Sequence, residues 1–415
     1  MVPMEKAFMD PVHGIIRLRE RWLLELVDAP EFQRLRRIRQ LGTSFGTYHG
    51  AEHTRFGHSL GALYVMERIL ARFAEVAGPV PEEAAVVARA AALLHDVGHG
   101  PLSHALEDVL TPGVRHEEWT RRILLDDTQL NRKLKAIEPS LPERIAAAIT
   151  GRSDPPWVSA LVSSQLDVDR MDYLLRDALF TGADYGRFQL DRIVHTLALE
   201  GDRVVIRHKG LQAAEEYVLA RYFMYWRVYL HKTTRGQEAL LRAIVRRAQR
   251  RPGMQSPLAR LWSGSPSLGD FLAVDDADLI VALKGWAEDP DPVLADLSRR
   301  FLDRRLLKPV FPTPVPAVPP EALASAAEVV AGMGYDPESY CLLDSAADVP
   351  YDPYIASGRG GPILVSMPQG PPVEISHLSS LIRALAGQRL AAANLYVPAE
   401  CRTLVRRAVG SLVSE

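Results

Sequence analysis

Six of the twelve histidines in this 415-residue chain lie between residues 53 and 116, in three short segments. The segments are 53–58 (HTRFGH), 95–104 (HDVGHGPLSH) and 116–117 (HE). A fourth segment, 167–172 (DVDRMD), contributes three carboxylates. Imidazoles and carboxylates together suit Mn, Fe, Mg, Co or Ni better than thiolates would. We therefore expect a fold that brings these separated segments together around one divalent ion.

The spacing of apolar residues, with Gly and Pro as stop signals, predicts that the first 250 residues are mainly helical. Helices are expected over residues 55–77, 82–95, 165–179, 187–197 and 213–250, and one is expected to begin at Pro101. A β-hairpin should join strands Leu197–Glu200 and Arg203–Arg207. The predicted fold class is mainly α: a helical bundle with a small β-hairpin, followed by an α+β C-terminal region.

Composition changes at residues 251–253 (RPG), which mark a candidate domain boundary. We predict a first domain over residues 1–250, a helical segment with a proline-rich linker over 251–320, and a small α+β region over 321–415. Six prolines between residues 308 and 320 favour an extended chain in the linker.

The composition, with 47% hydrophobic residues and a formal charge of −2, is typical of a globular protein and favours no polyanionic partner. Only Cys341 and Cys401 are present, which excludes a disulfide framework and fits a reducing compartment. Neither a signal peptide nor an apolar run long enough to cross a bilayer is evident. We expect a cytoplasmic protein with no membrane association.

Each part of the pattern also has a purely structural interpretation. His58 could be a hydrogen-bonded core residue, and Asp169 and Asp172 could form the solvated face of a helix. Asp169, Tyr173 and Asp177 share one helix face at i, i+4 and i+8, and Arg221, Tyr225 and Tyr229 repeat that spacing. The two rows fit a nucleotide pocket, although the second could also be an aromatic stripe in the core. The four segments in this order favour the metal site.

In that order and context, the motifs resemble those of the HD-domain hydrolases, named for the His-Asp pair, and most closely the deoxynucleoside triphosphate triphosphohydrolases. The resemblance runs from residue 10 to residue 232 and includes the segments 10–14 (DPVHG), 32–36 (FQRLR), 40–42 (QLG), 55–59, 95–104, 167–173 and 231–232. It implies a metal-dependent enzyme that splits a dNTP into deoxynucleoside and triphosphate. One divalent ion per site and a homo-oligomer, dimer or tetramer, are expected with it.

The resemblance also implies residue roles. The expected metal ligands are His58, His95, Asp96 and Asp169. The expected catalytic residues are His116 as general acid, Glu107 as its acidic partner, His99 and Asp169. The expected substrate contacts are Gln40, Leu41, Arg55, His104, Arg170, Tyr173, Asp177, Arg221, Tyr225 and Tyr229. Among them, Asp177 would hold the 3′-hydroxyl, while Leu41 and Tyr229 would crowd C2′. Candidate allosteric nucleotide contacts are Asp28, Gln33 and Arg36.

The chain departs from the family pattern at several positions. The triphosphohydrolase subgroup that the chain resembles includes a vertebrate enzyme. Arg170 and Tyr225 replace a lysine and a histidine of that enzyme, and Leu230 replaces a glutamine near the base, so base preference stays open. Ala7 and Met9 depart at the allosteric site, so activation by a nucleotide is not assumed.

Two rival functions remain: another HD nucleotidase or pyrophosphohydrolase, and a non-hydrolysing regulator that binds nucleotide or nucleic acid. One cationic segment has two possible interpretations. Five arginines between Arg242 and Arg251 would be an anion-binding patch or a solvated helix face. The exposed aromatic residues that stack single strands are not evident beside them, so nucleic acid is not favoured.

Overall fold

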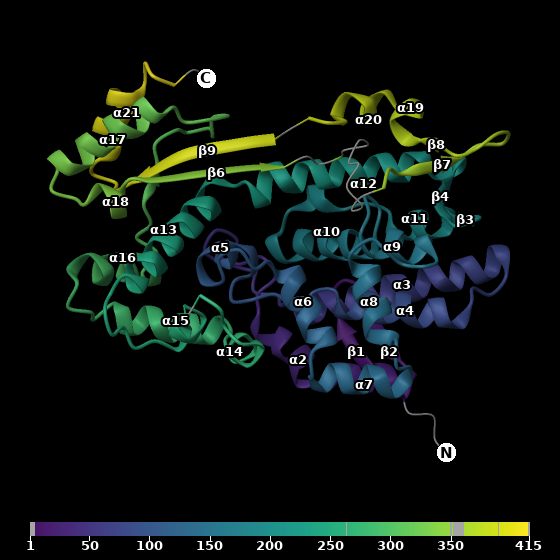
Figure 1. Cartoon of the computed structure of the whole chain (residues 1–415). Helices are drawn as coiled ribbons and strands as arrows, with labels where there is room; N and C mark the ends of the chain where they lie inside the picture. The colour runs from purple at the N-terminus through teal and green to yellow at the C-terminus, as the bar shows by residue number, and fades with distance from the viewer. Residues whose placement is uncertain (1–4, 263, 349–350, 352–360, 389, 414–415) are drawn as a thin grey trace.

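The protein is described by a computed structural model that covers residues 5–262, 264–348, 351, 361–388 and 390–413. A body of packed helices carries a long β-ribbon, β6–β9, along one side (Figure 1). The ribbon joins the helical body to a small group of helices near the C-terminus. The predicted fold class, mainly α with a helical bundle, a β-hairpin and a C-terminal α+β region, is confirmed.

The helices of the first 250 residues build the part of the body that carries the motif segments. They are α1 (Arg21–Val27), α2 (Pro30–Gln33), α3 (Arg55–Ala77), α4 (Glu82–Leu94), α5 (Glu107–Leu110), α6 (His116–Leu125), α7 (Gln129–Ile137), α8 (Leu141–Ile149), α9 (Pro156–Val162), α10 (Val168–Thr181), α11 (Leu190–Thr196), α12 (Leu211–Met224) and α13 (Lys232–Gln249). α3 packs against both α4 and α10, which places three of the four motif segments side by side.

The remaining helices follow α13 in sequence. They are α14 (Leu268–Leu272), α15 (Asp276–Trp286), α16 (Pro292–Leu302), α17 (Pro320–Gly332), α18 (Pro337–Tyr340), α19 (Ile375–Leu378), α20 (Ser380–Leu385) and α21 (Arg402–Val409). One continuous apolar core runs from Ile16 near the N-terminus to Val409 in α21. The C-terminal elements therefore share a core with the motif-bearing helices. The domain boundaries suggested by composition stay a prediction.

Among the described residues, the strands form three small sheets. They contain β1 (Lys6–Asp10) with β2 (Gly14–Leu18), then β3 (Leu197–Glu200), β4 (Arg203–Arg207), β7 (Leu364–Ser366) and β8 (Val373–Glu374), and finally β5 (Lys308–Pro309), β9 (Leu390–Val397) and β6 (Leu342–Asp348). The expected hairpin is present as β3–β4, and β7 adds to it in parallel. The N-terminal hairpin β1–β2 was not predicted.

Two helix predictions were wrong. Residues 101–103 do not begin a helix, because Leu102 and Ser103 both have positive φ, and only a short 3₁₀ turn follows (Ser103–Ala105). The long helix predicted over residues 213–250 is broken. A π-turn at Tyr225–Tyr229 ends α12, and the Leu230 amide donates to the Tyr225 carbonyl five residues back, 2.9 Å away. No Gly or Pro lies in the π-turn, whereas Pro101, which suits a first helical turn, favoured a helix start just before the residues with positive φ.

Candidate active site

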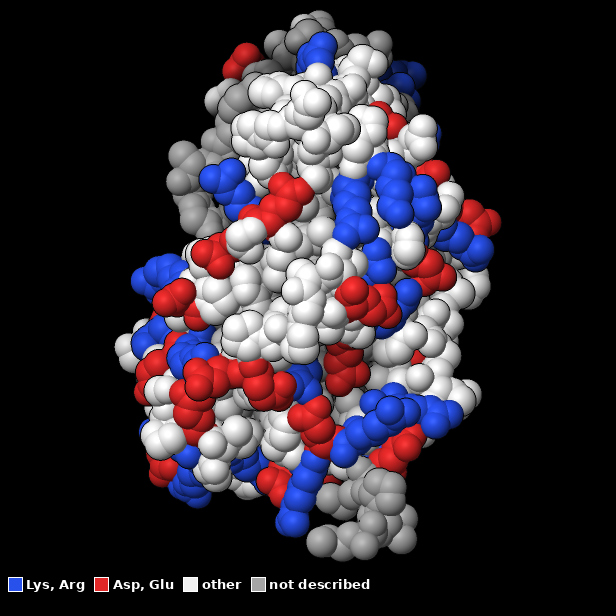
Figure 2. Space-filling model, turned by 90° about the vertical axis from the view of Figure 1, so that its right-hand side faces the viewer, with Lys and Arg blue, Asp and Glu red and all other residues white. Residues whose placement is uncertain are grey.

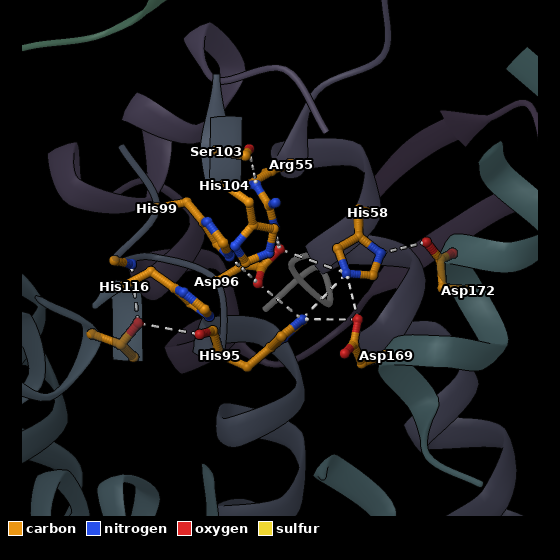
Figure 3. Close-up of polar contacts among 12 residues, drawn as sticks. Arg55, His58, His95, Asp96, His99, Ser103, His104, His116, Asp169 and Asp172 are labelled. Carbon is orange, nitrogen blue, oxygen red and sulfur yellow. Dashed lines mark hydrogen bonds and ion pairs between the residues drawn. The ribbon is translucent and has the colours of Figure 1, made fainter. Parts of the chain in front are cut away.

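Four side chains converge at the centre of the helical body (Figure 3). His58 lies in the first turn of α3, His95 and Asp96 follow α4 directly, and Asp169 lies in the first turn of α10. The His58 Nε2 atom is 3.2 Å from His95 Nε2, 3.1 Å from Asp169 Oδ1 and 3.7 Å from Asp96 Oδ2. His95 Nε2 is 3.5 Å from Asp96 Oδ1 and 3.6 Å from Asp169 Oδ1.

The donor set fits a divalent ion. Ligands about 2.1 Å from a metal stand roughly 3.0–3.4 Å apart, close to the separations found here. The other ring nitrogens are fixed: His58 Nδ1 lies 2.8 Å from Asp172 Oδ2, and His95 Nδ1 lies 2.9 Å from the Ala92 carbonyl. Acceptors at Nδ1 leave both Nε2 lone pairs free, as in metal-binding histidines.

The same cluster of side chains stabilises positive charge between its members. Burial lowers the pKa of His58, but hydrogen bonds to Asp169 and Asp172 outweigh it and raise the pKa to about 10. Burial opposes ionisation of Asp169, yet its hydrogen bonds with His58 and His95 hold the pKa well below the usual range. Four lone-pair donors facing one another would repel without a cation between them.

Asp172 anchors this cluster to the N-terminal hairpin. Besides His58, its carboxylate contacts His13 Nε2 at 2.7 Å and accepts two hydrogen bonds from Arg176. Arg176 also donates to Asp10, 2.9 Å away. From the sequence, Asp172 was interpreted as a possible helix-face residue, and no role was expected for His13. Their only signal was that they lie in the motif segments 10–14 and 167–173.

A second histidine cluster lies beside the first. Glu107 Oε1 is 2.9 Å from His116 Nδ1 and also accepts from the His116 backbone amide, while Oε2 is 3.4 Å from His104 Nδ1. Burial raises the pKa of Glu107, but the hydrogen bonds from both histidines outweigh it and lower the pKa far below normal. Glu107 is therefore an ionised acceptor that orients two imidazoles.

His99 links the two clusters. Its ring stacks on His116 with centroids 4.0 Å apart, and its Nε2 lies 3.3 Å from Asp96 Oδ1. Burial, followed by the charges of Arg55 and His116, holds the pKa of His99 well below normal. His99 is thus a neutral imidazole. Gly98 allows this closeness, because a Cβ there would lie 2.2 Å from the His116 carbonyl oxygen.

Arg55 crosses between the clusters. It is buried, donates through Nη1 to Asp96 and through Nε to the Ser103 hydroxyl, 2.7 Å away. Ser103 and its neighbour Leu102 occupy the left-handed region, with φ of 57° and 50°. Such backbone costs about 1–3 kcal/mol per residue and persists only where other contacts enforce it. Ser103 was not among the predicted site residues.

The sugar-side residues gather around Asp177. Its Oδ2 accepts a hydrogen bond from the Tyr229 hydroxyl at 2.8 Å, and its Oδ1 lies 2.7 Å from His53 Nε2. His53 in turn stacks on Phe180. Both carboxylate oxygens are therefore held in place by the protein, and each keeps a further lone pair for another donor. His53 belongs to the first histidine segment, but no role was assigned to it.

Most predicted residues line one cleft. They are Gln40, Leu41, Arg55, Asp96, His99, His104, His116, Asp169, Tyr173, Asp177, Tyr225 and Tyr229. Arg170 and Arg221 are instead bonded to Asp167 and Gln165, so the structure brings them near the cleft without placing them in its lining. Leu230, Thr234, Arg235, Glu238 and Ala346 complete the far end of the cleft. Of these, only Leu230 was considered from the sequence.

The candidate allosteric residues form a separate group outside that lining. Asp28 pairs with Lys6 at 3.4 Å, and the Gln33 amide donates to the Val27 carbonyl. Arg36 donates to Gln33 and covers the ring of Phe56. Their role in binding a nucleotide stays a prediction.

The arginines between residues 242 and 251 are largely paired across elements. Arg242 bonds Asp344, Arg247 bonds Asp291 and Asp336, Arg250 bonds Glu338, and Arg251 bonds Asp289. Glu338 belongs to α18 and Asp344 to β6, whereas Asp289, Asp291 and Asp336 lie in the loops before α16 and α18. Much of the positive charge is therefore neutralised where α13 meets the later part of the chain, which favours a structural explanation over an anion-binding patch.

Other cations gather at the end of the molecule that carries the β3–β4 hairpin. Figure 2 faces that end and shows Lys and Arg side chains grouped beside separate acidic ones. There the charge of Arg72, followed by those of Lys209, Arg192 and Arg207, lowers the pKa of the exposed His195. Positive charge is thus local, as expected for a chain with almost no net charge.

Comparisons with known proteins agree with this geometry. The HD domain model matches residues 55–177, and the HD associated region model matches residues 188–414. An uncharacterised protein of Bacillus subtilis, YwfO, is 36% identical over 403 residues, which cover 95% of this chain and 92% of that protein. The solved structure of a phosphohydrolase from Bacteroides thetaiotaomicron superposes with a TM-score of 0.84 and 31% identity, over 95% of this chain and 100% of that one.

The chain belongs to the HD-domain phosphohydrolase family. Within that family it is also similar to the deoxynucleoside triphosphate triphosphohydrolase SAMHD1 of Danio rerio, with 27% identity over 307 residues. That match covers 65% of this chain and 49% of the fish enzyme, so the chain spans about half of that enzyme's length. HD domains bind divalent metals, and the His58, His95 and Asp96 cluster can hold one. No helix among the described residues is long and apolar enough to span a membrane.

Proposed function

We propose that the chain is a metal-dependent dNTP triphosphohydrolase, which converts dNTP and water into deoxynucleoside and inorganic triphosphate. The observation that carries the proposal is one cleft whose lining combines three sets of side chains. They are Asp96 and Asp169 at the metal end, the imidazoles of His99 and His116, and Asp177 with Tyr229 at the sugar end. These sets suit a metal-bound α-phosphate, the leaving 5′-oxygen and a deoxyribose.

A divalent ion held by His58, His95, Asp96 and Asp169 would supply a nucleophilic water at neutral pH and neutralise charge on the phosphate. The new bond joins the water oxygen to the α-phosphorus, and the bond to the 5′-oxygen breaks. His116 would give the 5′-oxygen its proton through Nε2, because Glu107 occupies its Nδ1. Glu107 would stabilise the imidazolium until that transfer, and the neutral imidazole left behind would regain its proton from water.

The neighbouring groups have supporting roles in this scheme. Neutral His99 can donate a hydrogen bond to an α-phosphate oxygen without adding a charge that would compete with the ion. Arg55 adds a fixed positive charge beside Asp96. At the sugar end, Asp177 would accept the 3′-hydroxyl, while the ring of Tyr229 and the side chain of Leu41 leave little room at C2′ for a second hydroxyl.

The test is a screen of purified protein against all dNTPs and NTPs with Mn, Mg or Fe, with the products separated by ion-exchange chromatography. Tripolyphosphate and a deoxynucleoside in equal amounts are expected. Orthophosphate or pyrophosphate as the phosphate product would identify a different HD nucleotidase. Tight nucleotide binding with no product from any substrate would favour a non-hydrolysing regulator. A cytoplasmic location, a homo-oligomer and an allosteric nucleotide remain parts of this proposal.

A further inference from the structure

A single carboxylate from the later half of the chain holds two loops of the cleft together. Asp276 is the first residue of α15 and is only 5% exposed. Its Oδ1 accepts the backbone amide of Leu102 at 2.8 Å, and its Oδ2 accepts the backbone amide of Arg39 at 3.0 Å. Each oxygen therefore serves a different loop, one of them 174 residues away in sequence and the other 237.

The two loops carry site residues with different tasks. Arg39 is followed directly by Gln40 and Leu41, which line the sugar end of the cleft. Leu102 lies between His99 and His104, which line the phosphate end. A shift of either loop would change the distance between the two ends of the cleft, and a bound nucleotide must span both.

The loops also touch each other where Asp276 joins them. The Ser103 hydroxyl donates to the Arg39 carbonyl at 2.9 Å and accepts from Arg55 Nε. Gly42 passes so close to the other loop that a Cβ there would lie 2.9 Å from the Leu102 carbonyl oxygen. The left-handed conformation of Leu102 and Ser103 directs these groups, and unstrained backbone would not adopt it.

The segment before Asp276 also supports the loop 99–104, through Arg34 and Phe271. Arg34, which is fully buried, donates to the His99 carbonyl at 2.7 Å and to the Val274 carbonyl at 2.8 Å. The ring of Phe271 lies against Gly100. The segment 271–276 therefore forms a support beneath the loop that carries His99 and His104.

We propose that Asp276 is a positioning residue that fixes the loops 39–42 and 99–104 in the register needed for a nucleotide to reach both ends of the cleft. It touches neither substrate nor metal in this scheme. The assignment rests on the proposed function for its catalytic consequence, but its structural part stands on the two hydrogen bonds alone. It also gives α15, in the segment that composition marked as a helix and linker, a part in the active site.

The neighbouring Asp278 offers a matched control. It lies in the same first turn of α15, and its side chain accepts the backbone amide of Asp275 without reaching either loop. Asp276→Asn and Asp278→Asn remove the same negative charge from the same helix end, so their effect on the helix dipole is alike. Any difference between them reports on the loops.

The experiment combines hydrogen exchange with kinetics on the full chain. In Asp276→Ala, the backbone amides of Arg39 and Leu102 each lose a hydrogen bond to a charged group. Amide hydrogens in the peptide that contains Arg39, and in the separate peptide that contains Leu102, should therefore exchange at least about tenfold faster than in the wild type. In Asp276→Asn, one acceptor oxygen remains, so protection should be lost mainly on one loop. In Asp278→Asn, both loops should keep wild-type exchange.

With a dNTP substrate, kcat of Asp276→Asn should fall roughly 10–100-fold, in line with the cost of misplacing catalytic groups. Bound metal should stay at the wild-type level, and Asp278→Asn should keep normal kcat and KM. Unchanged exchange at both loops in Asp276→Asn, or equal acceleration in Asp278→Asn, would overturn the proposal. If the wild type hydrolyses no dNTP, the proposed function fails, and the exchange comparison still decides the role of Asp276.

Discussion

At the metal end of the cleft, His58 and Asp169 lie in the first turns of α3 and α10, and His95 and Asp96 directly follow α4. At the sugar end, Tyr225 and Tyr229 lie in a π-turn, and Leu41 lies in a loop. Helices packed on a shared core position the metal-binding atoms, whereas the sugar end depends on contacts between segments distant in sequence. The metal-binding residues therefore come from the helical framework, whereas Leu41, Tyr225 and Tyr229 come from a loop and a π-turn.

The largest effect is expected from removing a metal ligand. Asp96→Ala and His58→Ala should each lose bound metal and nearly all hydrolysis while remaining folded, because three donors bind an ion far more weakly than four. Metal per chain is measured by elemental analysis, with a thermal melt to verify folding. His195→Ala, at an exposed histidine far from the cluster, should keep both properties. One ion per chain retained in both ligand variants would mean that the metal end is assigned to the wrong residues.

The next largest effect is expected at His116, which lines the same cleft. His116→Ala should lower kcat by roughly 10²–10⁴-fold, the usual contribution of general acid catalysis, with metal content unchanged. Glu118→Gln, on the exposed side of the same helix, is the control, because Glu118 bonds only Arg121. Near-normal turnover in His116→Ala would remove this residue from the mechanism.

Tyr229 tests whether the sugar end selects deoxyribose. A pocket that merely crowds an added hydroxyl should discriminate by roughly 10²-fold, since steric rejection is weaker than loss of a required hydrogen bond. Tyr229→Ala should therefore lower the ratio of kcat/KM for dGTP over GTP to about ten or less. Tyr229→Phe removes only the hydrogen bond to Asp177 and should keep most of the ratio. Equal hydrolysis of both sugars by the wild type would favour a general nucleotidase.

The elements at the metal end could be predicted from the sequence better than those at the sugar end. The start of α3 at Arg55 and the end of α4 near His95 were predicted because apolar periodicity and the glycines after Val97 are local signals. The hairpin β3–β4 was predicted from its own turn. Local signals therefore predicted most of the helices that carry the metal end, and the family resemblance supplied the expected roles of His58, His95, Asp96 and Asp169 as ligands.

The π-turn between α12 and α13 had no local signal. Tyr, Trp and Val are tolerated in helices, so the pattern predicted one continuous helix. Two long-range contacts accompany the change: the Tyr48 hydroxyl donates to the Arg227 carbonyl, and Tyr229 bonds Asp177. The left-handed Leu102 is likewise held by Asp276, far along the chain. Contacts of this kind are invisible in a single sequence, which is why the π-turn and the contact of Asp276 with Leu102 were missed, although the family resemblance had named the sugar-side residues.

The smallest effect is expected at Arg170, which stands where the vertebrate enzyme has a lysine. Arg170 bonds Asp167, the N-cap of its own helix, so it must leave that partner to reach a phosphate. Competition of this kind weakens any phosphate contact, and a lysine keeps the charge without the bidentate fork. Arg170→Lys should therefore change KM for a dNTP by no more than about threefold, and Arg170→Ala should raise it about tenfold, the value of one charged hydrogen bond. Steady-state kinetics at saturating metal measures both, and kcat should stay near the wild-type value. If Arg170→Lys raises KM as much as Arg170→Ala does, the bidentate guanidinium itself binds phosphate. Arg170 would then be positioned for substrate as strictly as the residues of the metal end.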